Sequence, residues 1–230
     1  MTSRIESEPA FVLHTRPYQN TSLLVDLFTQ NHGRISALAR SARGIKSRYK
    51  NSLRPFCFLC VNWTGTRDLK NLSLVEFAEV PTQLYGDAIA CGFYANELLV
   101  KLLHCDDAMP ILFHAYKKLL QMLSSQEKQL AALRYFEKTL LKELGYAINL
   151  QQDIENELPI EPENYYQYIP QKGFRKNFSP NDYDFLGAHL IALHQETLAD
   201  EKSLQAAKRL MRMALKELLG EKEIRSRELF

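Results

Sequence analysis

The sequence changes its hydrophobic period near Pro81, and this change constrains the fold more than any other feature. Before Pro81, short runs rich in β-branched and aromatic residues alternate with clusters of turn residues, a pattern typical of strands. The runs lie at 10–16, 22–28, 33–39, 56–63 and 72–78. After Pro81, apolar residues recur at helical spacing. The chain is therefore predicted to be α+β, with strands first and helices after them.

The strand-rich part favours a small closed barrel of the OB type, because five short strands in about 80 residues suit that architecture. In "FTQNHGRIS", Gly33 can adopt a positive φ, which predicts a hairpin between the second and third strands. We expect two domains, with residues 1–80 as a nucleic-acid-binding barrel and residues 81–230 as a mainly helical domain. The stretch between the third and fourth strands becomes a long loop, with or without a short helix.

The helical part is predicted to hold five helices and a small insertion. The helices are expected at 82–104, 108–123, 127–145, 179–196 and 203–220. Two pairs of acidic residues, one just before the second helical run and one at the start of the fourth, predict N-terminal caps for these helices. These pairs are Asp106 with Asp107, and Asp182 with Asp184.

The insertion, at about 147–180, is predicted to be irregular with one β-hairpin. Its first part, 153–163, holds five carboxylates, two prolines and no basic residue, and is expected to be a solvated loop. The hairpin is expected to turn at Lys172–Gly173.

Positive charge is concentrated before Pro81. Residues 1–80 hold eleven Lys/Arg and six Asp/Glu, whereas the formal net charge of the whole chain is only +2. Residues 39–54, "ARSARGIKSRYKNSLR", hold six basic residues and no acidic one. Like charges repel one another unless an anion neutralises them, and a loop charged only for solubility usually mixes signs. We therefore predict contact with nucleic acid. The residues expected to contact DNA are Arg34, Arg40, Arg43, Lys46, Arg48, Lys50 and Arg54.

A second basic strip lies in the last predicted helix. Lys208, Arg212 and Lys216 follow one another at a spacing of four, so they share one helix face. A DNA contact and an ordinary solvated face of an amphipathic helix explain this pattern equally well. Both interpretations stay open at this point.

The sequence predicts no metal site and no cofactor. Cys57 and Cys60 form one C-x-x-C pair, but a structural zinc site usually needs two such pairs on tight turns. In a strand, these two thiols face opposite sides of the sheet, so we interpret them as small apolar side chains.

Catalytic motifs are absent from the sequence, and we predict that the protein is not an enzyme. No glycine-rich phosphate cradle and no nucleophile motif occur. Two alternatives to DNA binding remain. An RNA-binding OB protein would carry the same charge pattern. A metal-dependent nuclease using Asp153, Glu155 and Glu157 is less favoured, because alternating acids in a proline-containing loop are typically solvated.

Several segments occur together in one order: "AFVLHTRPYQNTSLLVDLFTQNHGRISALARSARGIKS", "LRYFEKTLLKELGYAINL", "AAKRLMRMALKELLG" and the terminal "SRELF". Together they resemble the RecO family of bacterial recombination mediators over nearly the whole chain. The resemblance implies an N-terminal OB fold, a helical C-terminal domain and no active site. It implies binding of single- and double-stranded DNA, strand annealing, partnership with RecR and assistance in loading RecA. It also implies contact with the C-terminal tail of the single-stranded-DNA-binding protein.

The third predicted helix is a candidate for that tail contact. Arg134 and Lys138 are four residues apart beside an apolar stripe that contains Phe136. A slot of this kind suits an acidic peptide that ends in a hydrophobic residue, with Arg134 pairing its carboxylate. Simple solvation of the two cations explains the pattern equally well. Some family members carry a four-cysteine zinc site in the C-terminal half, but this chain has no cysteine after Cys105.

The start of the sequence lacks the features of a secretory signal, since it carries Glu6 and Glu8 and no long apolar core. No apolar run approaches the roughly 18 residues of a membrane span. We therefore expect a cytoplasmic protein with reduced cysteines, which for a bacterial repair protein implies association with the nucleoid during repair.

Overall fold

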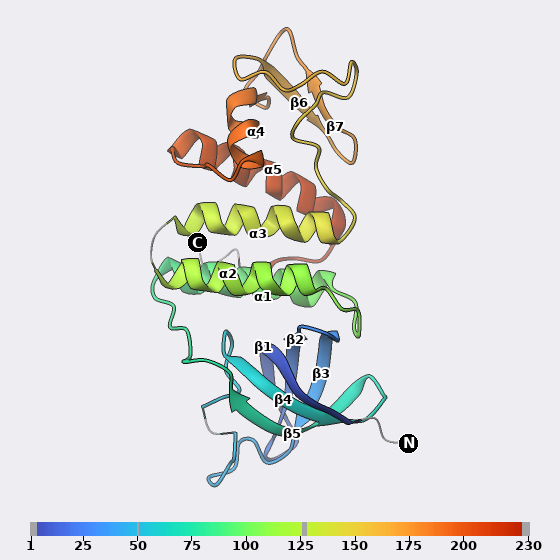
Figure 1. The fold of residues 1–230 in the computed structure, drawn as a ribbon, viewed down its shortest axis with the longest axis vertical. Coiled ribbons are helices and arrows are strands. Elements are labelled where there is room, and N and C mark those ends of the chain that lie inside the picture. Colours follow the sequence, from blue (N-terminus) through green and yellow to red (C-terminus); the bar gives the residue numbers. More distant parts are fainter. Residues whose placement is uncertain (1–3, 50, 126–127, 227–230) are drawn as a thin grey trace. The chain divides into compact units, whose positions relative to one another are not determined.

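The computed structural model describes residues 4–49, 51–125 and 128–226, and the chain forms two compact units (Figure 1). The barrel unit contains the described residues up to Ser125 together with those from Lys222 onward. The helical unit contains the described residues between them. The α+β fold class is confirmed. The domain boundary expected at residue 80 stays a prediction. The two compact units are defined by which segments pack together, and the first two helices pack with the barrel.

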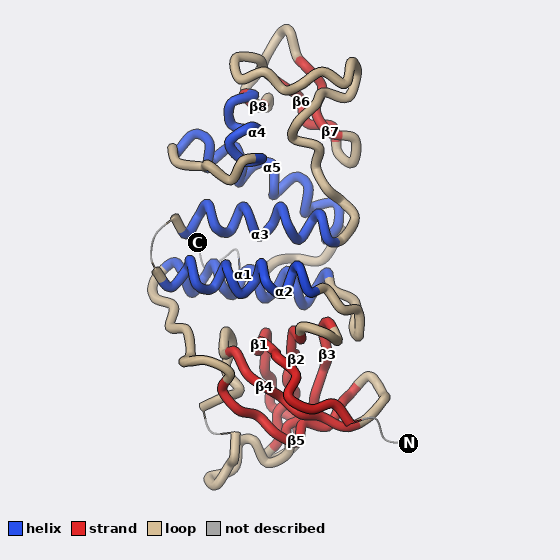
Figure 2. Tube along the Cα trace, in the orientation of Figure 1, coloured by secondary structure: helices blue, strands red, loops and turns tan. Residues whose placement is uncertain are grey.

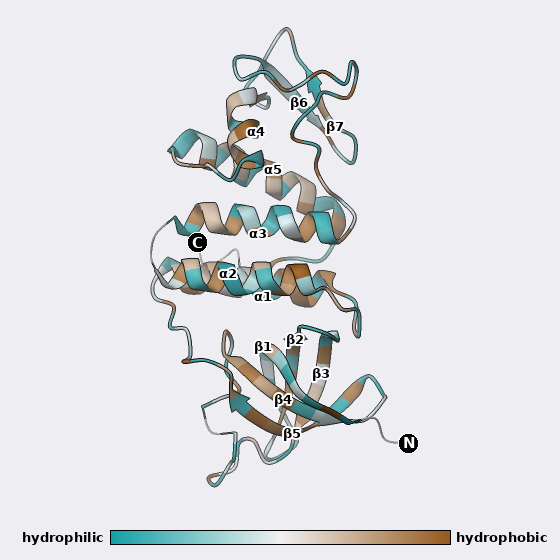
Figure 3. Cartoon of the chain, viewed as in Figure 1, coloured by the Kyte–Doolittle hydropathy of each residue, from teal (hydrophilic) through white to brown (hydrophobic). Residues whose placement is uncertain are grey.

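Five strands form an OB-like barrel, as the sequence predicts. They are β1 (Arg4–Tyr18), β2 (Ser22–Thr29), β3 (Gly33–Ala39), β4 (Phe58–Thr64) and β5 (Leu69–Phe77). The order is β1-β2-β3-β5-β4, and the ring closes because the long β1 pairs with both β2 and β4. The β3–β5 pairing is parallel and the others are antiparallel. Buried and half-buried residues alternate along β3, and Figure 3 shows hydrophobic and hydrophilic residues interleaved along the strands.

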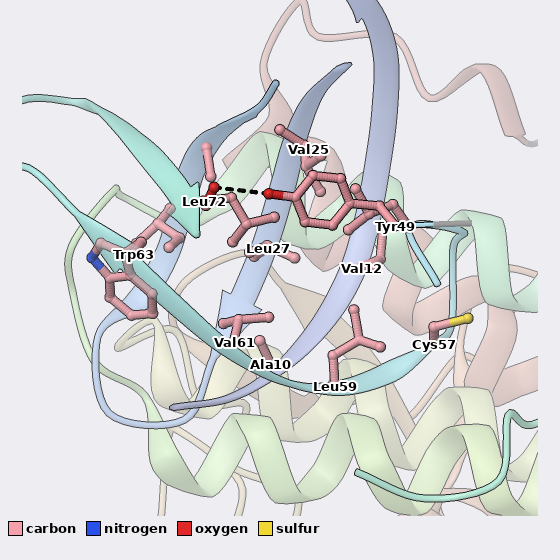
Figure 4. Packing of buried hydrophobic residues seen from close by; sticks show 14 residues of the cluster. Ala10, Val12, Val25, Leu27, Tyr49, Cys57, Leu59, Val61, Trp63 and Leu72 are labelled. Carbon is pink, nitrogen blue, oxygen red and sulfur yellow. Dashed lines mark hydrogen bonds between the residues drawn. The ribbon is translucent and has the colours of Figure 1, made fainter. Parts of the chain in front are cut away.

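Apolar side chains from all five strands fill the barrel. Figure 4 shows Val12, Leu27, Leu59 and Val61 meeting in its interior, with Trp63 at one side. These are β-branched, aliphatic or aromatic residues that pack well on a pleated surface. The barrel is therefore a filled core, and its ligand contacts have to come from loops and outer faces.

The β2–β3 hairpin depends on Gly33. This residue has a φ of 65°, as the sequence predicts. A Cβ atom at this position would lie 1.8 Å from the backbone oxygen of Asp107, so a larger residue would force the segment around Asp107 away.

Two helices of the barrel unit, α1 (Asp87–Leu102) and α2 (Pro110–Ser124), pack with each other and with the barrel (Figure 1). Phe113 of α2 lies 5.2 Å from Phe11 and 5.5 Å from Phe28, measured between ring centroids. From α1, the side chain of Asn96 donates a hydrogen bond to the backbone oxygen of Leu13 at 2.8 Å. These contacts explain why the first two helices belong to the same unit as the strands.

The caps expected for α2 are wrong. The N-cap position is Met109, with no side-chain hydrogen bond, and Pro110 begins the helix, where its missing N–H leaves no bond unmade. Asp106 instead forms an ion pair with Lys70 at 3.0 Å.

The helical unit combines three helices with a small sheet. The helices are α3 (Gln129–Glu143), α4 (Gly187–His194) and α5 (Glu201–Leu219), and α5 packs on both of the others. The sheet holds β6 (Tyr165–Ile169), β7 (Gly173–Lys176) and β8 (Phe185–Leu186) in the order β7-β6-β8 (Figure 2). The predicted hairpin is thus confirmed, with Ile169 paired to Gly173 at its turn. Among the described residues, no helix is both long and apolar enough to cross a membrane.

The helix expected at 179–196 is wrong over its first half. Only Gly187–His194 is helical, and its N-cap position is Leu186 without a side-chain bond. Residues 177–184 form a loop, in which the Asp184 carboxylate accepts hydrogen bonds from Asn177 and Asn181. Pro180 sits inside this loop, and the residue before a proline disfavours helical backbone.

The acidic segment at 153–163 is more ordered than expected. Asp153 is buried, and its carboxylate accepts hydrogen bonds from the backbone N–H groups of Glu155, Asn156 and Leu158 at 3.0, 2.8 and 3.1 Å. These bonds, led by that from Asn156, lower the pKa of Asp153. Asp153 therefore shapes a turn, and only its neighbours are solvated.

The last described residues return to the barrel unit and bind α1. The Glu97 carboxylate accepts hydrogen bonds from the backbone N–H groups of Arg225 and Ser226 at 3.0 and 2.8 Å, and from the Ser226 hydroxyl at 2.7 Å. Burial raises the pKa of Glu97, but these bonds and Lys101 outweigh it and bring the pKa to about 2. The chain thus leaves the barrel unit, builds the helical unit and comes back.

Candidate nucleic-acid interface

The basic loop, residues 39–54, begins at the last residue of β3 and leads toward β4, and its described residues after Ala39 lie mostly in turns and bends. Arg43 fixes it to the β1–β2 turn. Its guanidinium donates hydrogen bonds to the backbone oxygens of Gln19 (2.6 Å), Asn20 (2.8 Å) and Ser22 (3.2 Å). Its backbone N–H donates to Thr21 at 2.7 Å. Arg43 therefore holds the loop in place.

Tyr49 fixes the other end of the basic loop by inserting into the barrel. Its ring is buried among the interior residues, and its hydroxyl donates a hydrogen bond to the backbone oxygen of Leu72 at 3.0 Å (Figure 4). The same hydroxyl accepts a bond from Arg48 at 2.8 Å, and the Arg48 guanidinium lies 4.9 Å from the ring centroid. The loop is thus preorganised at two points before any ligand arrives.

The remaining basic side chains of the loop are exposed. Arg40 donates to the Asn71 side chain at 3.4 Å, and Arg54 donates to the Asn51 backbone at 3.0 Å, so both partners are neutral. Within the described ranges, no carboxylate pairs with Arg40, Lys46, Arg48 or Arg54. Their charges therefore remain uncompensated, which favours an anionic partner. Lys50 lies outside the described residues.

Arg34 lies apart from this surface. It is mostly buried, its Nε donates to the backbone oxygen of Leu103 at 3.2 Å, and its Nη1 lies 3.7 Å from an Asp26 carboxylate oxygen. It ties β3 to the segment after α1, and its predicted DNA contact gains no support from this position.

The second basic strip lies on α5, where Lys208, Arg212 and Lys216 are exposed on the shared face that their spacing predicts. The structure adds Lys202 and Arg209 to the same face, because residues seven apart lie nearly in line on a helix. Their contact with DNA stays a prediction.

The predicted peptide slot on α3 is closed. Arg134 is 6% exposed and forms an ion pair at 2.9 Å with Glu137, whose side chain is 0% exposed. Phe136 is buried in the core of the unit. Lys138 is paired with Glu196 at 3.0 Å. A peptide carboxylate would have to displace Glu137 from the interior, so this geometry gives the predicted role of Arg134 no support.

The cysteines and acids show no arrangement for metal binding in the part of the chain that the structure describes. Cys57 lies in the barrel interior, and burial raises the pKa of its thiol. Cys60 is half-buried and lies outside that interior cluster, as expected for the opposite face of a strand. The three acids weighed as a nuclease site include Asp153, whose oxygens already accept backbone N–H groups.

Comparison with known proteins covers nearly the whole chain. The family model "Recombination protein O N terminal" matches residues 1–81, and "Recombination protein O C terminal" matches residues 84–228. The DNA repair protein RecO of Coxiella burnetii (strain RSA 493 / Nine Mile phase I) is 50% identical over 230 residues, covering 100% of this chain and 99% of the relative. The DNA repair protein RecO of Actinobacillus pleuropneumoniae serotype 5b (strain L20) is 43% identical over 221 residues, covering 96% and 92%.

Proposed function

Because the chain belongs to the RecO family of DNA repair proteins, we propose that it binds single- and double-stranded DNA and anneals complementary strands during recombinational repair. The observation that carries this proposal is the basic loop, whose exposed cations have no carboxylate partner among the described residues while the loop itself is held by Arg43 and Tyr49.

Phosphate contacts at the basic loop do not depend on base sequence. Arg40, Lys46, Arg48 and Arg54 offer charge to any backbone, and such contacts position a nucleic acid without reading its bases. Arg43 acts indirectly, since its guanidinium is engaged with backbone oxygens of the β1–β2 turn. A sequence-independent surface is what a protein needs if it has to act on any damaged region.

Annealing follows from charge neutralisation. Two DNA strands repel each other, and a cationic surface that binds both lowers the repulsion. Each of the two units offers one basic surface, the loop in the barrel unit and the face of α5 in the helical unit. No nucleotide-binding motif occurs in the sequence, so annealing should need no ATP. Binding and annealing should weaken together as salt rises.

Partners follow from the family rather than from geometry. RecR as a binding partner, assistance in loading RecA, and contact with the tail of the single-stranded-DNA-binding protein are the expectations that family membership suggests. A cytoplasmic location accords with them. RNA binding would use the same charges, and the family of DNA repair proteins favours DNA.

The deciding experiment mixes complementary labelled strands with the protein, with and without Mg²⁺ and ATP. We expect faster duplex formation in all four conditions, and no shortened strands. A control variant loses three positive charges elsewhere, through replacement of Arg67, Lys142 and Lys172 by alanine. It should anneal like wild type, because these exposed cations lie outside both basic surfaces. Cleaved strands would support the nuclease alternative, and selective retention of RNA would support the RNA-binding one.

A further inference from the structure

Two exposed aromatic rings project from one loop of the helical unit. The aromatic loop, residues 177–184 between β7 and β8, carries Phe178 at 84% exposure and Tyr183 at 82%. Rings of this size gain free energy when they leave water, so a pair left this exposed calls for an explanation. Lys176 lies beside the first of them, with its ammonium 5.7 Å from the centroid of the Phe178 ring.

The aromatic loop is held by a network of its own. One oxygen of Asp184 accepts hydrogen bonds from Asn177 and from the backbone of Asn181, both at 2.8 Å. The side chains of Asn177 and Asn181 accept bonds from the backbones of Ser179 and Tyr183 at 3.0 and 2.8 Å. The backbone that carries the two rings is therefore fixed in advance, which reduces the entropy lost when a ligand stacks on them.

Arg209 connects this loop to α5. Its two terminal nitrogens donate hydrogen bonds to the backbone oxygens of Asp182 and Asp184, both at 2.6 Å. Its guanidinium carbon lies 4.3 Å from the centroid of Phe185. The loop and the polar face of α5 are consequently neighbours within one unit.

That face of α5 is basic along most of its length. With 100° of rotation per residue, the cationic positions fall within a sector about 120° wide. They are Lys202, Lys208, Arg209, Arg212 and Lys216. At about 1.5 Å rise per residue, Lys202 and Lys216 are about 21 Å apart along the axis. A stripe of this length can contact several successive phosphates of one strand.

A cavity of about 490 Å³ lies between the loop and the helix, lined by Tyr165, His189, Lys202, Arg209 and Asp184, among others. Asp184 is buried, and its second carboxylate oxygen has no hydrogen-bond partner among the described residues. Buried acceptors normally have a donor. The wall between the loop and the helix therefore contains an acceptor that the described residues leave without a donor.

We propose that the aromatic loop and the basic face of α5 form a binding site for single-stranded nucleic acid. Bases stack on Phe178 and Tyr183, while the phosphates follow the cations of α5. Asp182 and Asp184 place negative charge in the loop itself, so the loop contributes stacking and the helix contributes charge. Stacking on aromatic rings needs unpaired bases and tolerates any sequence. This inference rests on the proposed function and assigns strand selectivity to the helical unit.

The test compares wild type with the double variant Phe178→Ala/Tyr183→Ala. Affinity for an oligothymidylate should fall about tenfold for each stacked base that is lost, which corresponds to about 1.4 kcal/mol. Affinity for a blunt duplex should stay unchanged, and the salt slope should stay that of wild type, because no phosphate contact is removed. The variant Tyr146→Ala serves as the matched control, since Tyr146 is a half-exposed ring of the same unit outside this loop.

Three results are distinguishable. A loss confined to single strands supports the inference, and a Phe178→Trp variant should then show quenched emission on binding oligothymidylate. Wild-type affinity in the double variant, or an equal loss for single strands and duplex, overturns the inference while leaving the proposed function in place. If wild type binds no nucleic acid at all, the proposed function and this inference fall together. Thermal unfolding of each variant establishes that the fold is intact.

Discussion

The two units use arginine in opposite ways. In the barrel unit, Arg43 donates to three backbone oxygens, which are neutral, so its positive charge persists in the field around the loop. In the helical unit, Arg134 faces the carboxylate of Glu137, and the pair carries no net charge. Both side chains are structurally engaged, but only the first still attracts an anion. The charge of a bonding partner, and not the presence of a partner, decides whether a cation can act on DNA.

The largest expected effect comes from breaking the neutral pair. Replacing Arg134 with alanine leaves the Glu137 carboxylate buried without its cation, which typically destabilises by about 3–5 kcal/mol. Urea unfolding followed by circular dichroism should show this loss. Lys138→Ala is the control, because the half-exposed pair with Glu196 should contribute only about 0–1 kcal/mol. Equal stability of wild type and Arg134→Ala would contradict this view of the helical unit.

Glu97 is the anionic counterpart of Arg43, because most of the hydrogen bonds that its carboxylate accepts come from backbone N–H groups and a hydroxyl. Its folded pKa of about 2 lies below the ordinary value of 4.5, so its stabilising contribution is fully present above pH 4.5 and disappears as the pH falls through about 2. Glu97→Gln should lower the free energy of unfolding at pH 7 by about 1.5–3 kcal/mol. Unfolding curves at pH 7, 4 and 3 should show the two proteins converging. A difference that is independent of pH would contradict the assignment.

The smallest effect on stability should come from the exposed cations of the basic loop. Replacing Arg40, Lys46 and Arg54 with alanine should change the free energy of unfolding by less than about 0.5 kcal/mol. The salt dependence of single-strand binding should nevertheless flatten by about 0.7 for each lost phosphate contact. Fluorescence anisotropy at several salt concentrations measures this slope. An unchanged slope would show that the loop is not the DNA contact.

Local patterns in the sequence were sufficient for the barrel. Alternating residues such as those of β3, and a glycine before a β-rich run, define strands and a hairpin without information from elsewhere. The same holds for the shared face of Lys208, Arg212 and Lys216, which follows from helix geometry alone.

The roles of individual charges depended on distant segments and were not predictable in this way. Arg43 is held by oxygens more than 20 residues earlier, and Arg34 by an oxygen nearly 70 residues later. No periodicity encodes such contacts. Asp184 resembled a helix cap because it lies at the start of a predicted helical run. Its carboxylate instead accepts hydrogen bonds within the loop that contains Pro180, and the helix begins later. The aromatic loop was missed for the same reason, although its exposed Phe178 and Tyr183 flank a proline-containing turn.

The attachment of residues 225 and 226 to Glu97 has a consequence for synthesis. A ribosome makes the chain from its first residue onward, so the barrel can close long before its last partner exists. Until every residue of the helical unit has been translated, the Glu97 carboxylate on α1 lacks Arg225 and Ser226 and has Lys101, four residues later on the same helix, as its protein partner. A truncation after residue 221 would leave the Glu97 carboxylate permanently without Arg225 and Ser226. In such a shortened chain the Glu97 carboxylate would keep only its pairing with Lys101 on the same helix, so the last described residues of the chain complete the fold of its first helix.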